Sequence, residues 1–128
     1  MSYSINKRKY SVTGIGNAIV DIIAYVKEDF LNVCNLIKGT MRLVCDDEAE
    51  TLQSRIKVKK TISGGSAANT IAGLAVLGNS VAFIGKVKDD DLGRAFEDDL
   101  NALGITFMTK KVPDTKFVIF VLEYAMIV

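Results

Sequence analysis

Two polar residues stand out because they interrupt apolar sequence. Asp21 lies in the run Ile19 to Val26, and Asn69 lies one turn into the small, apolar stretch 67–77. A buried carboxylate or amide needs hydrogen-bond partners, because an unpaired polar group in apolar surroundings costs free energy. Asp21 and Asn69 are therefore candidate binding residues. The alternatives are that both cap neighbouring backbone, or that Asp21 is exposed on an edge strand.

A glycine pair precedes Asn69 in the segment Ser63-Gly64-Gly65-Ser66-Ala67-Ala68-Asn69. An apolar strand is expected before the pair and a helix after it. Glycines at such a junction leave backbone N–H groups accessible at the start of a helix, which suits a polar ligand. Gly64 and Gly65 thus join the candidate site.

Two other glycine clusters do not fit phosphate-binding motifs. The first, Gly14-Ile15-Gly16, has Ile19 where a dinucleotide-binding fingerprint needs its third glycine. The second, Gly73 to Ser80, has Asn79 in place of the lysine of a phosphate-binding loop, and it ends a helix instead of opening one. It is expected to stop the helix.

Composition excludes several kinds of chemistry. The chain has 128 residues and no histidine, which removes histidine-based triads and zinc sites. Its formal net charge of +1 gives no case for nucleic-acid or membrane partners. The two cysteines, Cys34 and Cys45, are expected to be free thiols. Asn17 and Asp21 interrupt the first apolar stretch, so neither a signal peptide nor a membrane span is expected, and the protein is predicted to be cytoplasmic.

Apolar spacing predicts how these residues are positioned. Strands alternate with helices along the chain, which favours an α/β fold with a largely parallel sheet. The well-marked helix after Asp89 to Asp91 has acidic residues in its first turn, where they complement the helix dipole. Strands are expected at 10–15, 19–26, 58–63, 80–87, 106–112 and 116–121, and helices at 27–38, 47–56, 67–77 and 91–103.

Three segments in order resemble the N-terminal part of the PfkB, or ribokinase-like, family of carbohydrate and nucleoside kinases. Gly16-Asn17-Ala18-Ile19-Val20-Asp21-Ile22 is similar to the opening substrate motif. Residues 64–69 resemble the Gly-Gly-x-x-x-Asn signature, and residues 83–93 resemble the segment that closes it. The Gly-Asn-x-x-x-Asp form is nearest the adenosine-kinase-like branch.

The resemblance implies ATP- and Mg²⁺-dependent phosphoryl transfer to a primary hydroxyl of a sugar or nucleoside. Asp21 and Asn69 would bind sugar hydroxyls, Gly65 in the Gly64-Gly65 pair would offer its backbone N–H, and Asn17 would contact the substrate near the base. The family's catalytic base and ATP site lie in a C-terminal half that this sequence does not match. No catalytic or metal-binding residue is therefore expected in the chain.

The resemblance also implies the fold. We expect residues 1–128 to form the N-terminal half of a Rossmann-type three-layer domain, with a small β-sheet lid from strands near 22–26, 58–63 and 106–111. Because the tail 117–128 ends in an apolar run, the chain is expected to be truncated and inactive alone. Expected partners are a complementary C-terminal polypeptide or a second copy joined through the lid. The alternative is a noncatalytic remnant that binds a nucleoside or sugar, or only dimerises.

Overall fold

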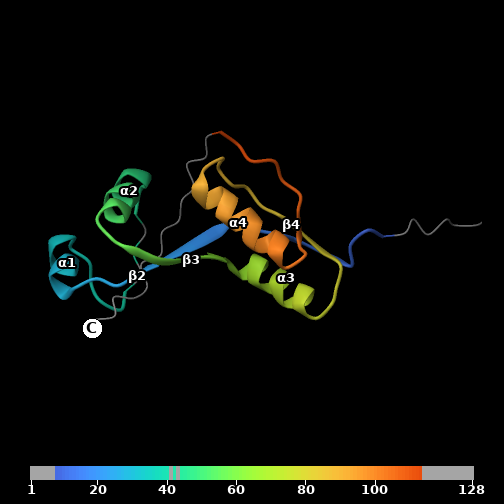
Figure 1. The fold of residues 1–128 in the computed structure, drawn as a ribbon, viewed down its shortest axis with the longest axis horizontal. Coiled ribbons are helices and arrows are strands. Elements are labelled where there is room, and N and C mark those ends of the chain that lie inside the picture. Colours follow the sequence, from blue (N-terminus) through green and yellow to red (C-terminus); the bar gives the residue numbers. More distant parts are fainter. Residues whose placement is uncertain (1–7, 41, 43, 114–128) are drawn as a thin grey trace, which may run out of the picture.

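The computed structural model describes residues 8–40, 42 and 44–113, which fold into a mixed α/β structure with two sheets (Figure 1). The main sheet has the strand order β1-β4-β5, with all neighbours parallel. Its strands are β1 (Val12–Ile15), β4 (Val81–Ile84) and β5 (Thr106–Phe107). The predicted strand at 116–121 and the apolar tail lie outside the described residues.

A second, two-stranded antiparallel sheet is formed by β2 (Ile19–Ala24) and β3 (Val58–Gly64), and we call it the lid sheet. Two short helices lie between its strands in the sequence, α1 (Glu28–Val33) and α2 (Asp46–Ser54). In Figure 1 these helices lie at the end of the molecule farthest from α3. The expected helix at 27–38 ends early, because Asn35 adopts a positive φ of 52°.

Two longer helices, α3 (Ser66–Val76) and α4 (Asp91–Ala102), pack on one face of the main sheet. Their buried side chains meet those of β4 in a single core. Its aromatic centre is Phe83 and Phe96, both fully buried with ring centroids 5.8 Å apart. The described residues thus supply the sheet and one helical layer of the expected fold. The core consists of Ala68, Ile71, Val81, Phe83, Val87, Phe96, Leu100 and Ile105.

The glycines of the first cluster let α3 lie directly against β1. A Cβ added to Gly14 would lie 2.5 Å from Ile71 Cγ1, and one added to Gly16 would lie 2.6 Å from Ala67 Cβ. Both distances are too short for carbon atoms in contact. Close helix packing therefore explains this cluster, and it places the start of α3 beside the carboxyl end of β1.

The start of α4 and the end of α3 each carry a recognisable sequence signal. Asp90 caps α4, since its Oδ1 accepts a hydrogen bond from the Gly93 amide at 2.8 Å. Gly78 follows α3 with a φ of 84°, which confirms that the second glycine cluster stops a helix. At the C-terminal end of α3 the apolar side chains of Val76 and Leu77 are largely exposed.

The prediction that residues 106–111 add a third lid strand is wrong. β5 pairs in parallel with β4, with Ala82 opposite Thr106. The chain then continues along the same neighbour, because the amide of Met108 donates to the Phe83 carbonyl and that of Val112 to the Val87 carbonyl. The segment leaves α4 beside β4, and a short connection favours pairing with that adjacent strand. The lid sheet of the described residues therefore has two strands.

No helix within the described part of the chain is both long enough and apolar enough to cross a lipid bilayer.

Candidate functional site

The predicted site residues gather where the lid sheet joins the main sheet. β2 follows the carboxyl end of β1, and β3 ends at the start of α3, so both connections meet at the same edge. Ile19 lies opposite Gly64 in the lid sheet, and Asp21 lies opposite Ile62. The segments 16–21 and 62–69 therefore run side by side, although more than 40 residues separate them in the sequence.

Asp21 lies directly against the first glycine of the pair. A Cβ added to Gly64 would lie 2.7 Å from Asp21 Oδ2. Any other residue at position 64 would displace this carboxylate or move the backbone. Because Gly64 has no side chain, the Asp21 carboxylate can lie directly against the backbone of the turn.

The second glycine takes a conformation that other residues rarely adopt. Gly65 has φ 98° and ψ 139°, and a Cβ there would lie 3.1 Å from the Asn17 backbone oxygen. The Gly65 carbonyl accepts a hydrogen bond from the backbone N–H of Asn69 at 2.8 Å, and this bond begins α3. The turn thus connects Asn17, the glycine pair and Asn69 through adjacent backbone.

Asp21 and Asn69 are not buried, since both are exposed, as is Asn17. For Asp21 the structure confirms the alternative expectation, exposure on an edge strand. Among the described residues, no polar or charged side chain is buried. A two-stranded sheet cannot cover both of its faces, so a polar residue in β2 reaches solvent despite its apolar neighbours. Desolvation therefore does not single out these residues. Their exposure leaves their oxygen and nitrogen atoms accessible to a ligand.

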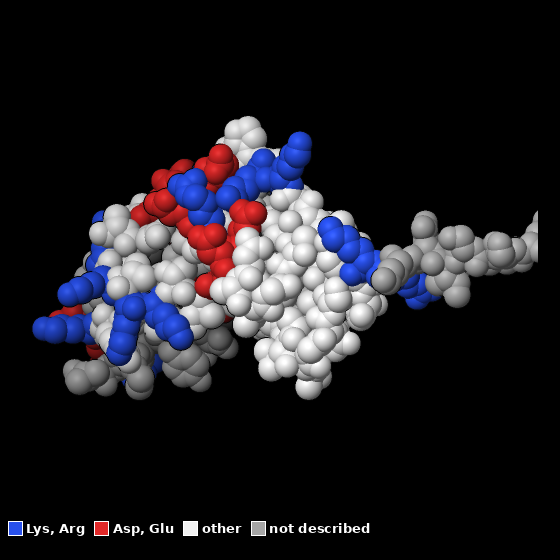
Figure 2. Space-filling model, turned by 45° about the vertical axis from the view of Figure 1, so that its right-hand side comes forward, with Lys and Arg blue, Asp and Glu red and all other residues white. Residues whose placement is uncertain are grey.

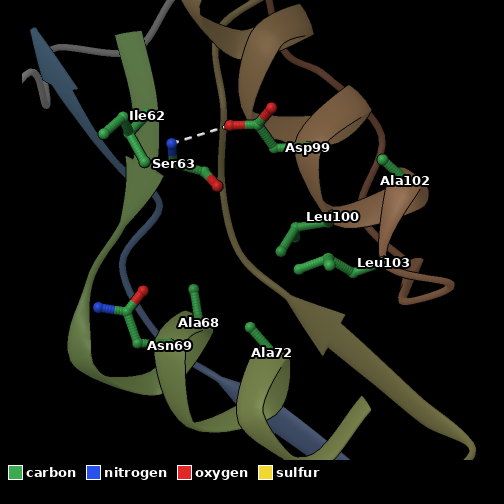
Figure 3. Close-up of a pocket in the computed structure, with 9 residues that line it drawn as sticks. All are labelled: Ile62, Ser63, Ala68, Asn69, Ala72, Asp99, Leu100, Ala102 and Leu103. Atoms are coloured by element: carbon green, nitrogen blue, oxygen red, sulfur yellow. Dashed lines mark hydrogen bonds between the residues drawn. The ribbon is translucent and has the colours of Figure 1, made fainter. Parts of the chain in front are cut away.

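A pocket of about 370 Å³ lies between β3, α3 and α4 (Figure 3). Ala68 and Ala72 of α3 face Leu100 and Leu103 of α4 across it, and the Asn69 amide group points away from α4. Of the predicted site residues only Asn69 lines it. The pocket therefore adjoins the Asp21 and Gly64 cluster without containing it.

Sequence reasoning missed one polar contact at this pocket. The Ser63 amide donates a hydrogen bond to Asp99 Oδ2 at 2.9 Å, across 36 positions of sequence (Figure 3). Asp99 is one of several acidic residues on the exposed side of α4, and such a row is typical of a solvated helix face. Nothing in the sequence distinguishes it from its neighbour Asp98.

Charge is distributed unevenly over the surface (Figure 2). Acidic side chains gather over α4, and basic side chains spread over the lid sheet, where β3 contributes Lys59 and Lys60. Arg94 pairs with Asp91 at 2.7 Å and Asp89 at 3.1 Å, and the hydrogen bond with Asp91 raises the pKa of Arg94. These charges lie outside the Asp21 and Gly64 cluster.

The described residues do not fit a resident metal ion, because none of their acidic or thiol side chains forms a group of three or more that could hold one. Cys34 and Cys45 are free thiols. What this part of the chain can do is bind and orient a polar molecule through a carboxylate, an amide and backbone N–H groups.

Comparisons with solved structures show that the fold is that of part of a ribokinase-like kinase. The chain is 50% identical to an adenosine kinase from Sinorhizobium meliloti, with a TM-score of 0.66 over 82% of this chain and 32% of that one. It is 41% identical to a probable sugar kinase from Rhizobium etli CFN 42, with a TM-score of 0.66 over 81% of this chain and 32% of that one. The search of curated proteins found no match.

The sequence model described as "pfkB family carbohydrate kinase" matches residues 12–121. The chain therefore belongs to the pfkB family of carbohydrate kinases, as its three motifs predicted. It spans about a third of the length of the solved structures it matches. Contact of Asn17, Asp21, Gly64, Gly65 and Asn69 with a substrate stays a prediction.

Proposed function

We propose that this chain is the acceptor-binding part of an adenosine-kinase-like enzyme, which transfers a phosphoryl group from ATP to a primary hydroxyl of a nucleoside or sugar. The observation that carries the proposal is the Asp21 carboxylate against Gly64, at the turn that begins α3. The 50% identity to the adenosine kinase supports a nucleoside over a free sugar. A Schistosoma mansoni adenosine kinase in complex with adenosine, 21% identical, shares the fold.

The chain's own groups suit recognition of a ribose. A carboxylate accepts hydrogen bonds from two neighbouring hydroxyls, and the Asn69 amide both donates and accepts. The backbone N–H of Gly65 adds a donor that needs no side chain. These groups would hold the acceptor in one orientation, which is the main protein contribution to phosphoryl transfer.

ATP and Mg²⁺ are assigned to the whole enzyme, and we place their binding groups in a C-terminal polypeptide that complements this chain. When bound, ATP would supply the phosphoryl group and Mg²⁺ would neutralise its charge. A chain that only orients the acceptor has no group to accept the hydroxyl proton. We therefore expect the isolated chain to bind without turnover.

Calorimetric titration of the chain with adenosine, and separately with ribose, tests this function. We expect saturable adenosine binding that weakens about tenfold or more in Asp21→Ala, since a hydrogen bond to a charged group contributes about 1.5–3 kcal/mol. Asp29→Ala is the matched control, because Asp29 is an exposed carboxylate on α1 outside the site.

Two outcomes would contradict the proposal. If neither ligand binds the wild-type chain, the acceptor site is not retained, and self-association without ligand binding would then favour a dimerisation remnant. ATP-dependent phosphorylation of adenosine by the purified chain would show that a catalytic group does lie within it.

A further inference from the structure

We propose that Asp99 is a positioning residue for the acceptor site: it holds the backbone amide of Ser63 and thereby fixes the turn at Gly64 and Gly65. This inference rests on the proposed function and adds to that site a residue that touches no substrate. It starts from the 2.9 Å hydrogen bond between the Ser63 amide and Asp99 Oδ2.

The Ser63 amide points away from the lid sheet. Ser63 lies opposite Val20 in the antiparallel pair, and in such a pair only alternate residues exchange hydrogen bonds with the partner strand. The amide of Ser63 therefore faces outward and needs an acceptor elsewhere. Asp99 supplies that acceptor from the main part of the fold.

Asp99 stands on a rigid support. Its neighbour Leu100 and Phe96, three positions before it, are both buried in the core, so the position of this turn of α4 is fixed by packing. Groups on a packed helix are held more accurately than groups on a loop. The hydrogen bond therefore ties the end of β3 to the core.

The residue after Ser63 begins the glycine pair. Gly64 lies against the Asp21 carboxylate, and Gly65 has φ 98°. Glycine has the most flexible backbone of all residues, so a glycine pair keeps one conformation only when neighbouring groups hold it there. The backbone N–H of Asn69 donates to the Gly65 carbonyl and fixes the end of the turn at α3. Asp99 fixes the other end, at Ser63.

The other acidic residues of this region do not share the role. Asp91 and Asp89 pair with Arg94, and Glu97 pairs with Lys111 at 2.6 Å. Asp98, next to Asp99, is exposed, and no hydrogen bond or ion pair of its side chain is seen among the described residues. Asp98→Ala is therefore a matched control that removes the same charge from the same helix turn.

The test compares wild type, Asp99→Ala, Asp99→Asn and Asp98→Ala by adenosine titration and by amide hydrogen exchange measured with NMR. We expect Asp99→Ala to weaken adenosine binding about fivefold, the equivalent of one lost hydrogen bond. It should also speed exchange at Ser63, Gly64 and Gly65. Asp99→Asn should restore part of both, because its amide oxygen still accepts, and Asp98→Ala should match wild type.

Exchange that stays at the wild-type rate in Asp99→Ala would overturn the inference, whether or not adenosine binds. Equal losses of affinity in Asp99→Ala and Asp98→Ala would also overturn it, since net charge would then explain both. If the alanine variant does not fold, Asp99→Asn carries the test, and exchange at Ser63, Gly64 and Gly65 that is no faster than in wild type counts against the role. A wild-type chain that binds no adenosine refutes the proposed function, while the exchange data still decide the role of Asp99.

Discussion

The central strand of the main sheet, β4, and the strand β2 of the lid sheet contain similar apolar residues but bury them to different extents. Phe83 of β4 is fully buried under α3 and α4. In contrast, Ile23 of β2 is 41% exposed, and Tyr25, which directly follows the end of β2, is 43% exposed. The difference lies in the number of layers, because β4 has a neighbour on each edge and helices on one face. The lid sheet has two strands within the described residues. A two-stranded sheet is marginally stable by itself.

The candidate site lies where these two regions meet. Gly65 and Asn69 belong to the connection into the core, and Asp21 belongs to the lid sheet. A ligand that contacts both would therefore be held partly by a rigid surface and partly by a more adjustable one. Local opening is easier where few apolar side chains are buried, so the lid sheet is expected to exchange its amides faster than β4.

The largest expected difference between the two regions comes from the aromatic core. Phe96→Ala should lower the free energy of unfolding by about 3–5 kcal/mol, because it removes a fully buried ring and leaves a cavity. Urea denaturation measures the loss. Leu77→Ala is the control, since Leu77 is 78% exposed and should change the free energy by less than about 0.5 kcal/mol. Similar losses in both variants would mean that the core around Phe83 and Phe96 does not govern stability.

A smaller effect is expected at the boundary between the regions. Gly65→Ala should destabilise the chain by about 1–3 kcal/mol, because its φ of 98° is strained for alanine and the Asn17 oxygen lies 3.1 Å from the new Cβ. Gly73→Ala is the matched control in α3, where a Cβ meets open space. It should stabilise the helix by about 0.5–1 kcal/mol.

Thermal and urea unfolding of both glycine variants measure the change in the free energy of unfolding, which should fall in Gly65→Ala and rise in Gly73→Ala. A stable Gly65→Ala variant that keeps wild-type adenosine affinity would show that the turn does not need its left-handed conformation. The boundary would then be no more constrained than the rest of the lid sheet.

The smallest effect is expected within the lid sheet. Lys59 Nζ lies 4.1 Å from the centre of the Tyr25 ring and 2.8 Å from its hydroxyl. Lys59→Met should cost about 0.5–1 kcal/mol, since cation–π pairs at exposed sites are weak. Lys60→Met, on the neighbouring position of β3, is the control and should be neutral. A loss above that of Phe96→Ala would reverse the comparison between the two regions.

Much of the fold could be predicted from local sequence. The expected strands at 10–15, 58–63 and 80–87 correspond to β1, β3 and β4, and the helix after Asp90 begins with the expected acidic turn. The third lid strand was wrong, because the alternating pattern at 106–111 fits an edge strand of either sheet. Only its pairing with β4 decided between them.

The candidate site was predicted for a reason that the structure does not support. Asp21 and Asn69 were singled out as buried polar groups, yet both are exposed. Their spacing relative to Gly64 and Gly65, and the family motifs that contain them, predicted that these residues lie together, and the structure places Asp21 against Gly64. Their contact with a substrate stays a prediction. Asp99 could not be found in this way, because a carboxylate on an exposed helix face gives no signal of its partner.

The sequence by itself determined the family and the order of most elements, because these depend on local residue types and their spacing. The tertiary structure decided which distant residues meet. It placed Asp21 against Gly64, joined Ser63 to Asp99 across 36 positions, and assigned β5 to the main sheet. Such contacts depend on how whole layers pack, and a one-dimensional pattern of polar and apolar residues is compatible with more than one such packing.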